Sequence, residues 1–315
     1  SMPKITFMGA GSTVFAKNVL GDSMMTPALE DSVIALYDID LERLEDSRRM
    51  VENINHKYNG KAKIKAYTDR IEALRGADFI VNSVNVGGYE PCTVTDFEIP
   101  KKYNLRQTIA DTLGIGGIFR TLRTIPVIEE FCEDIRKVCP NALFLNYANP
   151  MAMITGYMQR YTGVRTIGLC HSVQVCVRDL FKSIGMQEYY EGCRWEIAGI
   201  NHQAWLLSGK DKDGNDLYPE IKKRSLSGEY AETMAWDLVR HDMMHRFGYY
   251  ITESSEHTAE YTPYYIKRNY PELIDRYKVP LDEYLRRCVR QINNWKTLRE
   301  KVLSTDIEHT KTWEY

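Results

Sequence analysis

Cys170 and His202 are the residues of this sequence best suited to bind a metal ion. Cys170 follows a predicted strand, Thr166–Leu169, and precedes a helix that we expect to begin near Ser172. Backbone N–H groups at the beginning of a helix favour a thiolate, the form of cysteine that binds metals. His202 opens an apolar stretch, so a second ligand also lies at the edge of regular structure. Two protein ligands leave a divalent ion with open positions, as a catalytic metal needs.

Either residue could instead be structural. Free cysteines are among the most buried residues, and a histidine at the edge of an apolar stretch can simply be hydrogen-bonded. The pair alone does not separate the two interpretations. The elements that must position the two side chains are therefore needed to decide between them.

The N-terminal segment has the order of elements that binds a dinucleotide. A predicted strand, Lys4–Met8, ends in Gly9, Gly11 and Ser12, and a helix over Phe15–Met25 follows. A glycine turn between a strand and a helix N-terminus forms a cradle for pyrophosphate. The third glycine of the common fingerprint is absent, since position 14 is a valine.

The next strand, Val33–Tyr37, ends at Asp38, where a carboxylate can accept hydrogen bonds from both ribose hydroxyls of NAD. The same charge would repel the 2′-phosphate of NADP. Asp38 could instead cap the following helix, but Asp40 fits that role better. The sequence therefore predicts an NAD site.

Strands and helices continue to alternate, with predicted strands at 63–66, 79–84 and 142–147 and helices at 70–75 and 118–138. This pattern predicts a Rossmann-like, doubly wound parallel sheet. The carboxyl ends of such strands open into one crevice. We therefore expect five residues to face the same ligands: Gly9, Asp38, Asn82, Asn149 and Cys170.

From Arg194 the pattern changes to strands at 195–198 and 204–208 and helices at 229–247 and 281–303. We expect a dinucleotide-binding domain at 1–190 and an α+β substrate and metal domain at 191–315. The sequence ends without a helix stop signal, so we expect the native chain to continue and this one to be C-terminally truncated.

Two further segments carry candidate acid and base groups. Asp111 is the one acid in a glycine-rich stretch, 109–117, before the long helix, and it could be a solvated loop residue or lie close to a ligand. Residues 252–265 are polar and mixed in type, which predicts a loop with several groups able to transfer protons.

The composition excludes several classes of function. A net charge of −2 gives no electrostatic case for nucleic acid or an anionic membrane, and no apolar run has the length of a membrane span. The seven cysteines show no disulfide framework, which favours a reducing cytoplasm. A small, polar ligand is the best expectation.

Six segments together resemble glycoside hydrolase family 4, the NAD- and manganese-dependent glycosidases. They are Gly9-Ala10-Gly11-Ser12, Ala110-Asp111-Thr112, Asn149-Pro150, Cys170-His171-Ser172-Val173, Gly199-Ile200-Asn201-His202 and Glu253-Ser254-Ser255-Glu256-His257. The resemblance spans the whole chain. The Cys-His-Ser-Val segment is similar to that of the α-galactosidase subgroup, whereas phosphosugar members have Asn or Asp after the cysteine.

The resemblance implies hydrolysis of an α-galactoside by transient oxidation at sugar C3, loss of the C2 proton, elimination and addition of water. NAD would take and return the hydride, and Mn²⁺ or a similar divalent metal, held by Cys170 and His202, would polarise the C2 and C3 oxygens. By similarity the base is Tyr261, made more basic by Asp111, with Glu256 as the second candidate.

The resemblance also gives His171 the role of protonating the leaving aglycone, unless that residue only supports the neighbouring Cys170, and it gives Asn149 the role of holding substrate hydroxyls. It further implies a homo-oligomer acting on a small molecule. Two alternatives stay open: an NAD-dependent dehydrogenase of the lactate/malate type, and a non-catalytic NAD-binding regulatory protein.

Overall fold

The computed structural model describes residues 2–311, which form two compact units. Within the described residues, unit 1 comprises 2–88, 121–169 and 288–311, and unit 2 comprises 89–120 and 170–287. These units differ from the predicted division into 1–190 and 191–315. The difference arises because residues 89–120 pack with the second unit and residues 288–311 pack with the first.

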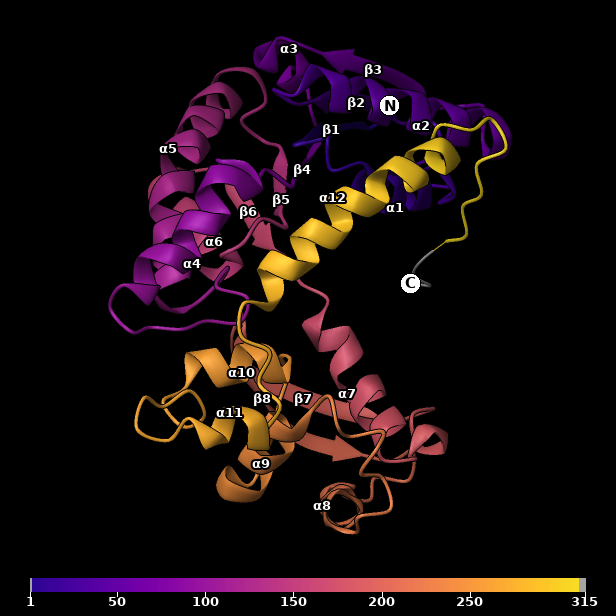
Figure 1. Ribbon diagram of the computed structural model, residues 1–315. Coiled ribbons are helices and arrows are strands. Elements are labelled where there is room, and N and C mark those ends of the chain that lie inside the picture. Colours follow the sequence, from indigo (N-terminus) through magenta and orange to yellow (C-terminus); the bar gives the residue numbers. More distant parts are fainter. Residues whose placement is uncertain (1, 312–315) are drawn as a thin grey trace. The chain divides into compact units, whose positions relative to one another are not determined.

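A six-stranded parallel sheet forms the centre of unit 1, with the strand order β3-β2-β1-β4-β5-β6 (Figure 1). This is the order of a doubly wound, Rossmann-like sheet, so the predicted fold is confirmed. The strands are β1 (Lys4–Met8), β2 (Val33–Tyr37), β3 (Lys63–Tyr67), β4 (Phe79–Asn82), β5 (Leu143–Asn146) and β6 (Arg165–Gly168). The helices are α1 (Thr13–Met24), α2 (Leu41–Tyr58), α3 (Arg70–Leu74) and α6 (Met151–Tyr161), together with parts of α5 (Gly114–Val138) and α12 (Glu283–Val302).

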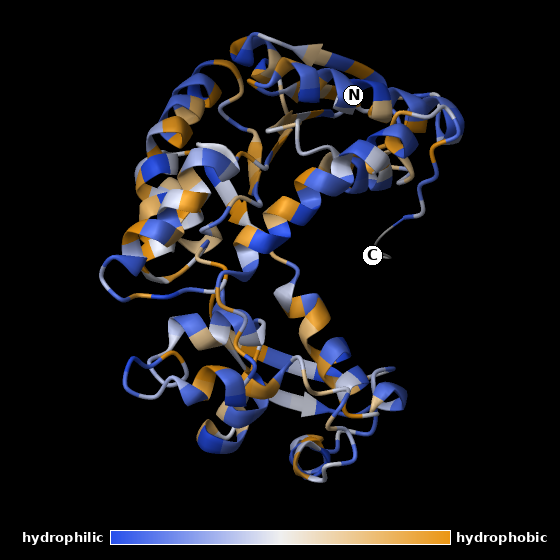
Figure 2. Ribbon diagram, viewed as in Figure 1, coloured by the Kyte–Doolittle hydropathy of each residue, from blue (hydrophilic) through white to orange (hydrophobic). Residues whose placement is uncertain are grey.

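Successive side chains of a strand point to opposite faces, and unit 1 accordingly has two cores. Phe7 of β1 belongs to one buried cluster, which also contains Val302 of α12, while the next residue, Met8, belongs to the other. Helix α12, for example, alternates between hydrophobic (orange) and hydrophilic (blue) segments in Figure 2, as expected of a helix with one apolar face. Because helices cover both faces of the sheet, its central strands are buried on both sides.

Unit 2 is an α+β unit with a three-stranded antiparallel sheet, β7-β8-β9, which confirms the predicted change of architecture. Its strands are β7 (Arg194–Ile200), β8 (Gln203–Lys210) and β9 (Tyr250–Ile251). Its other elements are η1 (Gly88–Thr93), α4 (Val94–Lys101), α7 (Ser172–Ser183), η2 (Gln187–Tyr189), α8 (Tyr218–Leu226), α9 (Leu238–Phe247), α10 (Ser255–Tyr261) and α11 (Glu272–Arg276). Among residues 2–311, no helix is both long enough and apolar enough to cross a membrane.

Two predictions for unit 2 were wrong in detail. The helix expected over 229–247 begins only at Leu238, after Asp237, whose buried carboxylate binds Arg240 and Ser255. The expected loop at 252–265 contains helix α10. Its polar side chains did not indicate a buried element, but Ser254 caps the helix and tertiary partners satisfy the polar groups.

Candidate metal and dinucleotide sites

The two predicted metal ligands, Cys170 and His202, meet in unit 2. Cys170 lies between β6 and α7, and His202 lies in the turn between β7 and β8. The Cys170 Sγ atom is 3.4 Å from His202 Nε2 and 2.9 Å from Ser172 Oγ. Residues 32 positions apart therefore present a sulfur and a nitrogen at one point, as the sequence analysis expected.

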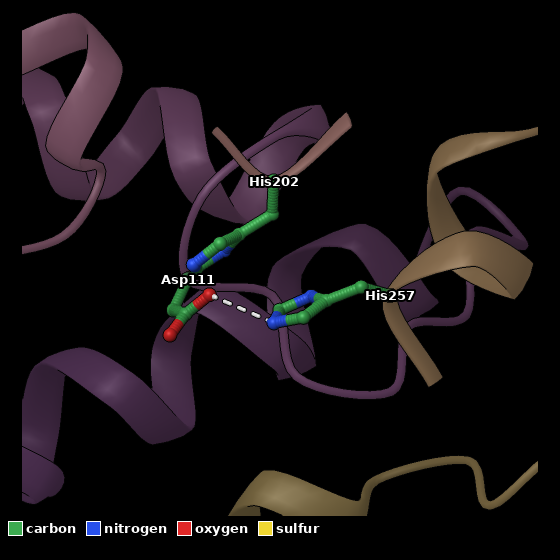
Figure 3. A group of neighbouring side chains, drawn as sticks. All are labelled: Asp111, His202 and His257. Atoms are coloured by element: carbon green, nitrogen blue, oxygen red, sulfur yellow. Dashed lines mark ion pairs between the residues drawn. The ribbon is translucent and has the colours of Figure 1, made fainter. Parts of the chain in front are cut away.

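Three more side chains surround His202, and they define two groups of possible metal donors. Cys170, His202 and Glu253 form one group, and Asp111, His202 and His257 form the other. Within each group the donor atoms lie within 4.8 Å of one another. Figure 3 shows the second group, with Asp111 and the two imidazoles converging from three separate segments of the chain.

Helix α10 and the residue before its cap supply much of this site. His257 and Glu260, at i and i+3, lie along one face of α10, whereas Glu253 precedes the cap residue Ser254 and lies outside the helix. The His257 Nδ1–H group donates to Glu260 Oε2 over 3.0 Å, and His257 Nε2 lies 3.8 Å from both Asp111 Oδ1 and Glu253 Oε2. His257 is thus enclosed by three carboxylates.

The electrostatics of the site follow from this arrangement. Burial would lower the pKa of His257, but the bond to Glu260 and the charges of Asp111 and Glu253 raise it to about 9. Burial and the neighbouring His257 lower the pKa of His202 to about 4. Burial would raise the pKa of Asp111, yet the positive charge of His257 leaves it lowered. At neutral pH His202 is therefore the neutral imidazole that a metal requires.

These residues fit a divalent metal. The Nε2 atom of His202 faces the Cys170 thiol, while its buried Nδ1 atom has no hydrogen-bond partner among the described residues. Sulfur, imidazole nitrogen and carboxylate oxygen are all donors to borderline divalent ions such as Mn²⁺ and Zn²⁺. With two or three protein ligands, such an ion keeps open positions.

The predicted dinucleotide loop lies at the carboxyl end of β1 in unit 1. The Gly9 N–H group donates to the Tyr37 carbonyl, and the Gly11 N–H group donates to Asp38 Oδ2 over 2.7 Å. Gly9 has a φ of +82°, and a Cβ atom there would lie 2.8 Å from the backbone of Ser83. Only glycine permits this close approach, which leaves the beginning of α1 free to receive a phosphate.

Asn82, at the end of β4, has a further feature of a ligand site. Its side chain is completely buried, and its Nδ2 group donates to Asn146 Oδ1. Its Oδ1 atom has no hydrogen-bond partner among residues 2–311. A buried carbonyl oxygen without a donor is costly, and a bound ligand could supply that donor. The Asp38 carboxylate also accepts the Asp40 N–H group, so it is held rigidly beside the glycines.

The remaining predicted residues have different surroundings. Tyr261 stacks on His257 with ring centroids 5.0 Å apart, and burial raises its pKa. His171 is the exposed N-cap residue of α7. Glu256 lies in the first turn of α10, where its backbone carbonyl accepts from the Thr108 hydroxyl, but its carboxylate belongs to neither donor group. Asn149 precedes α6 in unit 1.

Three residues of the metal cluster were not assigned from the sequence: Glu253, His257 and Glu260. The signal was their helical spacing, together with Ser254 as a cap. The spacing and the cap residue can both be seen in the sequence, but the polarity of residues 252–265 favoured a loop over a helix. The role of Glu260 also depends on residues 108–110, which the sequence places about 150 positions away.

Comparison with known proteins assigns the family. Residues 4–186 match the family 4 glycosyl hydrolases, and residues 197–315 match the C-terminal domain of the same family. The chain belongs to this family. The match favours a glycosidase over both alternatives, the dehydrogenase and the non-catalytic regulator.

Individual relatives agree with this assignment. An α-galactosidase from Bacillus subtilis is 58% identical over 315 residues, covering 100% of this chain and 72% of that protein. An α-galactosidase from Rhizobium meliloti is 37% identical over 279 residues, which cover 87% of this chain and 55% of the relative. The solved structure of a 6-phospho-α-glucosidase from gut microorganisms, in complex with NAD and Mn²⁺, has the same fold (TM-score 0.71, 23% identity, 93% of this chain and 69% of that one).

Substitution of Gly9 by alanine tests the dinucleotide loop. We expect Gly9→Ala to abolish detectable NAD⁺ binding, because the new Cβ would push against the backbone of Ser83. Gly60→Ala is a matched control, since Gly60 has a φ of +76° but no atom within 4 Å of the added Cβ. It should cost about 1 kcal/mol of stability and leave binding unchanged. Isothermal titration with NAD⁺ and thermal unfolding give both quantities, and equal NAD⁺ affinity in the two variants would contradict this role.

Alkylation of the cysteines tests the metal ligand. We expect iodoacetamide at pH 8 to label Cys170 and Cys92, and added Mn²⁺ to protect Cys170 alone. Burial raises the pKa of Cys132 and Cys139 to about 11 and of Cys176 to about 12, so these thiols should stay unlabelled. Peptide mass spectrometry measures each site. Labelling of Cys170 that is indifferent to Mn²⁺ would argue against its role.

Proposed function

We propose that this chain hydrolyses α-galactosides with NAD and a divalent metal, Mn²⁺ in the first instance, as cofactors. The observation that carries the proposal is 58% identity along the whole chain to a Bacillus subtilis α-galactosidase. The convergence of Cys170 and His202 and the glycine loop at Gly9 support it, because they offer a site for each cofactor. When bound, NAD⁺ supplies a reversible hydride acceptor and the metal supplies a Lewis acid.

In the proposed site Cys170 and His202 hold the metal. Gly9, Gly11 and Ser12 receive the pyrophosphate of NAD, and Asp38 accepts its ribose hydroxyls. We assign Asn82 to the same cofactor site, which the unsatisfied Oδ1 atom supports. Asn149 is proposed to hold substrate hydroxyls.

Proton transfer is assigned to three residues of unit 2. Tyr261 is the proposed base for the C2 proton, with Glu256 as the second candidate. Burial raises the pKa of Tyr261 and the charges of Glu260 and Asp111 raise it further, which supports the expected effect of Asp111 on its basicity. His257, a cation at neutral pH, stacks on the Tyr261 ring. His171 is the proposed donor to the leaving aglycone.

We also propose a cytoplasmic location and a homo-oligomeric state. The cysteines are free thiols, which supports a reducing compartment. The homo-oligomeric state is proposed from the family resemblance alone.

Hydrolysis of a chromogenic α-galactoside in D₂O tests the function. With NAD⁺, Mn²⁺ and a thiol reductant we expect turnover, no net NADH and one deuterium at C2 of the released galactose. Cys170→Ser should lower kcat/KM by roughly a hundredfold or more, because the variant loses a metal ligand. Cys193→Ser, the same change at a thiol outside the cluster, is the control. Hydrolysis that continues after complete removal of dinucleotide and metal would refute the mechanism.

A further inference from the structure

A carboxylate, Glu253, lies against the two proposed metal ligands. Its Oε1 atom is 3.9 Å from His202 Nε2, the same nitrogen that lies 3.4 Å from Cys170 Sγ. All three donor atoms fall within 4.8 Å of one another. Donors that share one ion at roughly 2.0 to 2.4 Å are themselves separated by about 3 to 4 Å, so these distances are close to those of a coordinated ion.

The Glu253 carboxylate is also largely withdrawn from water. Its side chain is only 12% exposed, and among the described residues its ion pairs are with His202 and His257 alone. A carboxylate withdrawn from water is stable only when a cation or several donors compensate it. A metal ion beside Oε1 would provide such a cation.

The second oxygen of Glu253 lies at one end of a chain of contacts that passes through His257 and Glu260 of α10. Oε2 lies 3.8 Å from His257 Nε2, and the opposite ring nitrogen of His257 donates to Glu260. Glu260 is anchored in turn, because its Oε1 atom accepts N–H groups from Thr108, Ile109 and Ala110 at 2.9 to 3.2 Å. A metal ligand whose other oxygen is fixed in this way keeps its orientation when the ion leaves.

We propose that Glu253 is a third protein ligand of the metal, and that His257 and Glu260 are positioning residues that orient it. The inference rests on the proposed function, since the ion is that of the glycosidase. The Cys170 thiolate and the Glu253 carboxylate are anionic and the His202 imidazole is neutral. Together they would balance the charge of a divalent ion. The remaining positions would be open to two neighbouring hydroxyls of a sugar.

The competing donor group, Asp111, His202 and His257, would use His257 Nε2 as a ligand instead. That nitrogen faces two carboxylate oxygens, each at 3.8 Å, and its ring partner Nδ1 donates to a third carboxylate. Such surroundings suit an N–H donor between carboxylates better than a bare nitrogen that binds a cation.

Mn²⁺ titration of the full chain, without NAD⁺ or sugar, tests the proposal. The EPR signal of free Mn²⁺ measures affinity independently of activity. We expect Glu253→Gln to weaken Mn²⁺ binding at least about tenfold and Cys170→Ser to do so at least as strongly. His257→Gln keeps an amide N–H near the position of Nε2. Its Mn²⁺ affinity should therefore fall less than that of Glu253→Gln or Cys170→Ser. Glu220→Gln removes a carboxylate of the same unit that pairs with Arg224, and it should bind as the parent does.

Several outcomes overturn the proposal. If Glu253→Gln binds Mn²⁺ within twofold of the parent while Cys170→Ser does not, Glu253 is no ligand and the proposed function stands. If His257→Gln loses as much Mn²⁺ affinity as Cys170→Ser while Glu253→Gln keeps the affinity of the parent, the ion is bound by the competing group, Asp111, His202 and His257. If no variant changes affinity, the proposed metal site itself fails. Should Glu253→Gln not fold, Glu253→Asp keeps the charge on a shorter side chain, and unchanged affinity in that folded variant likewise excludes Glu253.

Discussion

Three backbone N–H groups, those of Thr108, Ile109 and Ala110, donate to a single carboxylate, Glu260. The other oxygen of that carboxylate holds the imidazole of His257. This buried group therefore joins the segment that carries Asp111 to the helix that follows Glu253. Together with the bond from the Thr108 hydroxyl to the Glu256 carbonyl, it brings residues about 150 positions apart to one point and helps to orient the acids around His202.

The same segment depends on a second constraint, at the beginning of α5. Gly117 lies so close to Thr112 that an added Cβ would be 2.2 Å from the Thr112 carbonyl oxygen. The glycines at 114, 116 and 117 had suggested a loop that approaches a ligand. They instead belong to the first turn of α5, where they let the chain around Asp111 fold back on the helix. Asp111 is consequently buried rather than solvated.

The sequence predicted those elements whose structure depends on neighbouring residues, such as strands, glycine turns and helix caps. The strand, glycine turn and helix around Gly9 were predicted within a few residues of their observed bounds, and Asp40 caps α2 as expected. Cys170 and His202 were also expected to meet, and the structure places their side chains in contact. The family resemblance was confirmed by the comparisons.

What could not be predicted depends on tertiary contacts. Helix α10 looks like a loop because its polar residues find their partners elsewhere in the fold, as Ser255 does at Asp237. Helix α12 was assigned to the second domain by its place in the sequence. Its Val302 and Trp295 pack with the core of unit 1, and Arg43 of α2 lies 3.8 Å from the centre of the Trp295 ring. The hydrophobic stripe of α12 predicts a helix but does not say which core it covers.

The central claim is that unit 2 assembles one metal site in which a thiolate and an imidazole are joined by a carboxylate. Anomalous scattering at the manganese edge, from crystals of the protein grown with Mn²⁺, tests it most directly. We predict a single peak in this cluster at about 2.1 to 2.4 Å from Cys170 Sγ, His202 Nε2 and a Glu253 oxygen. A peak bound by Asp111 and His257 without the cysteine, or no peak beside His202, would contradict the account.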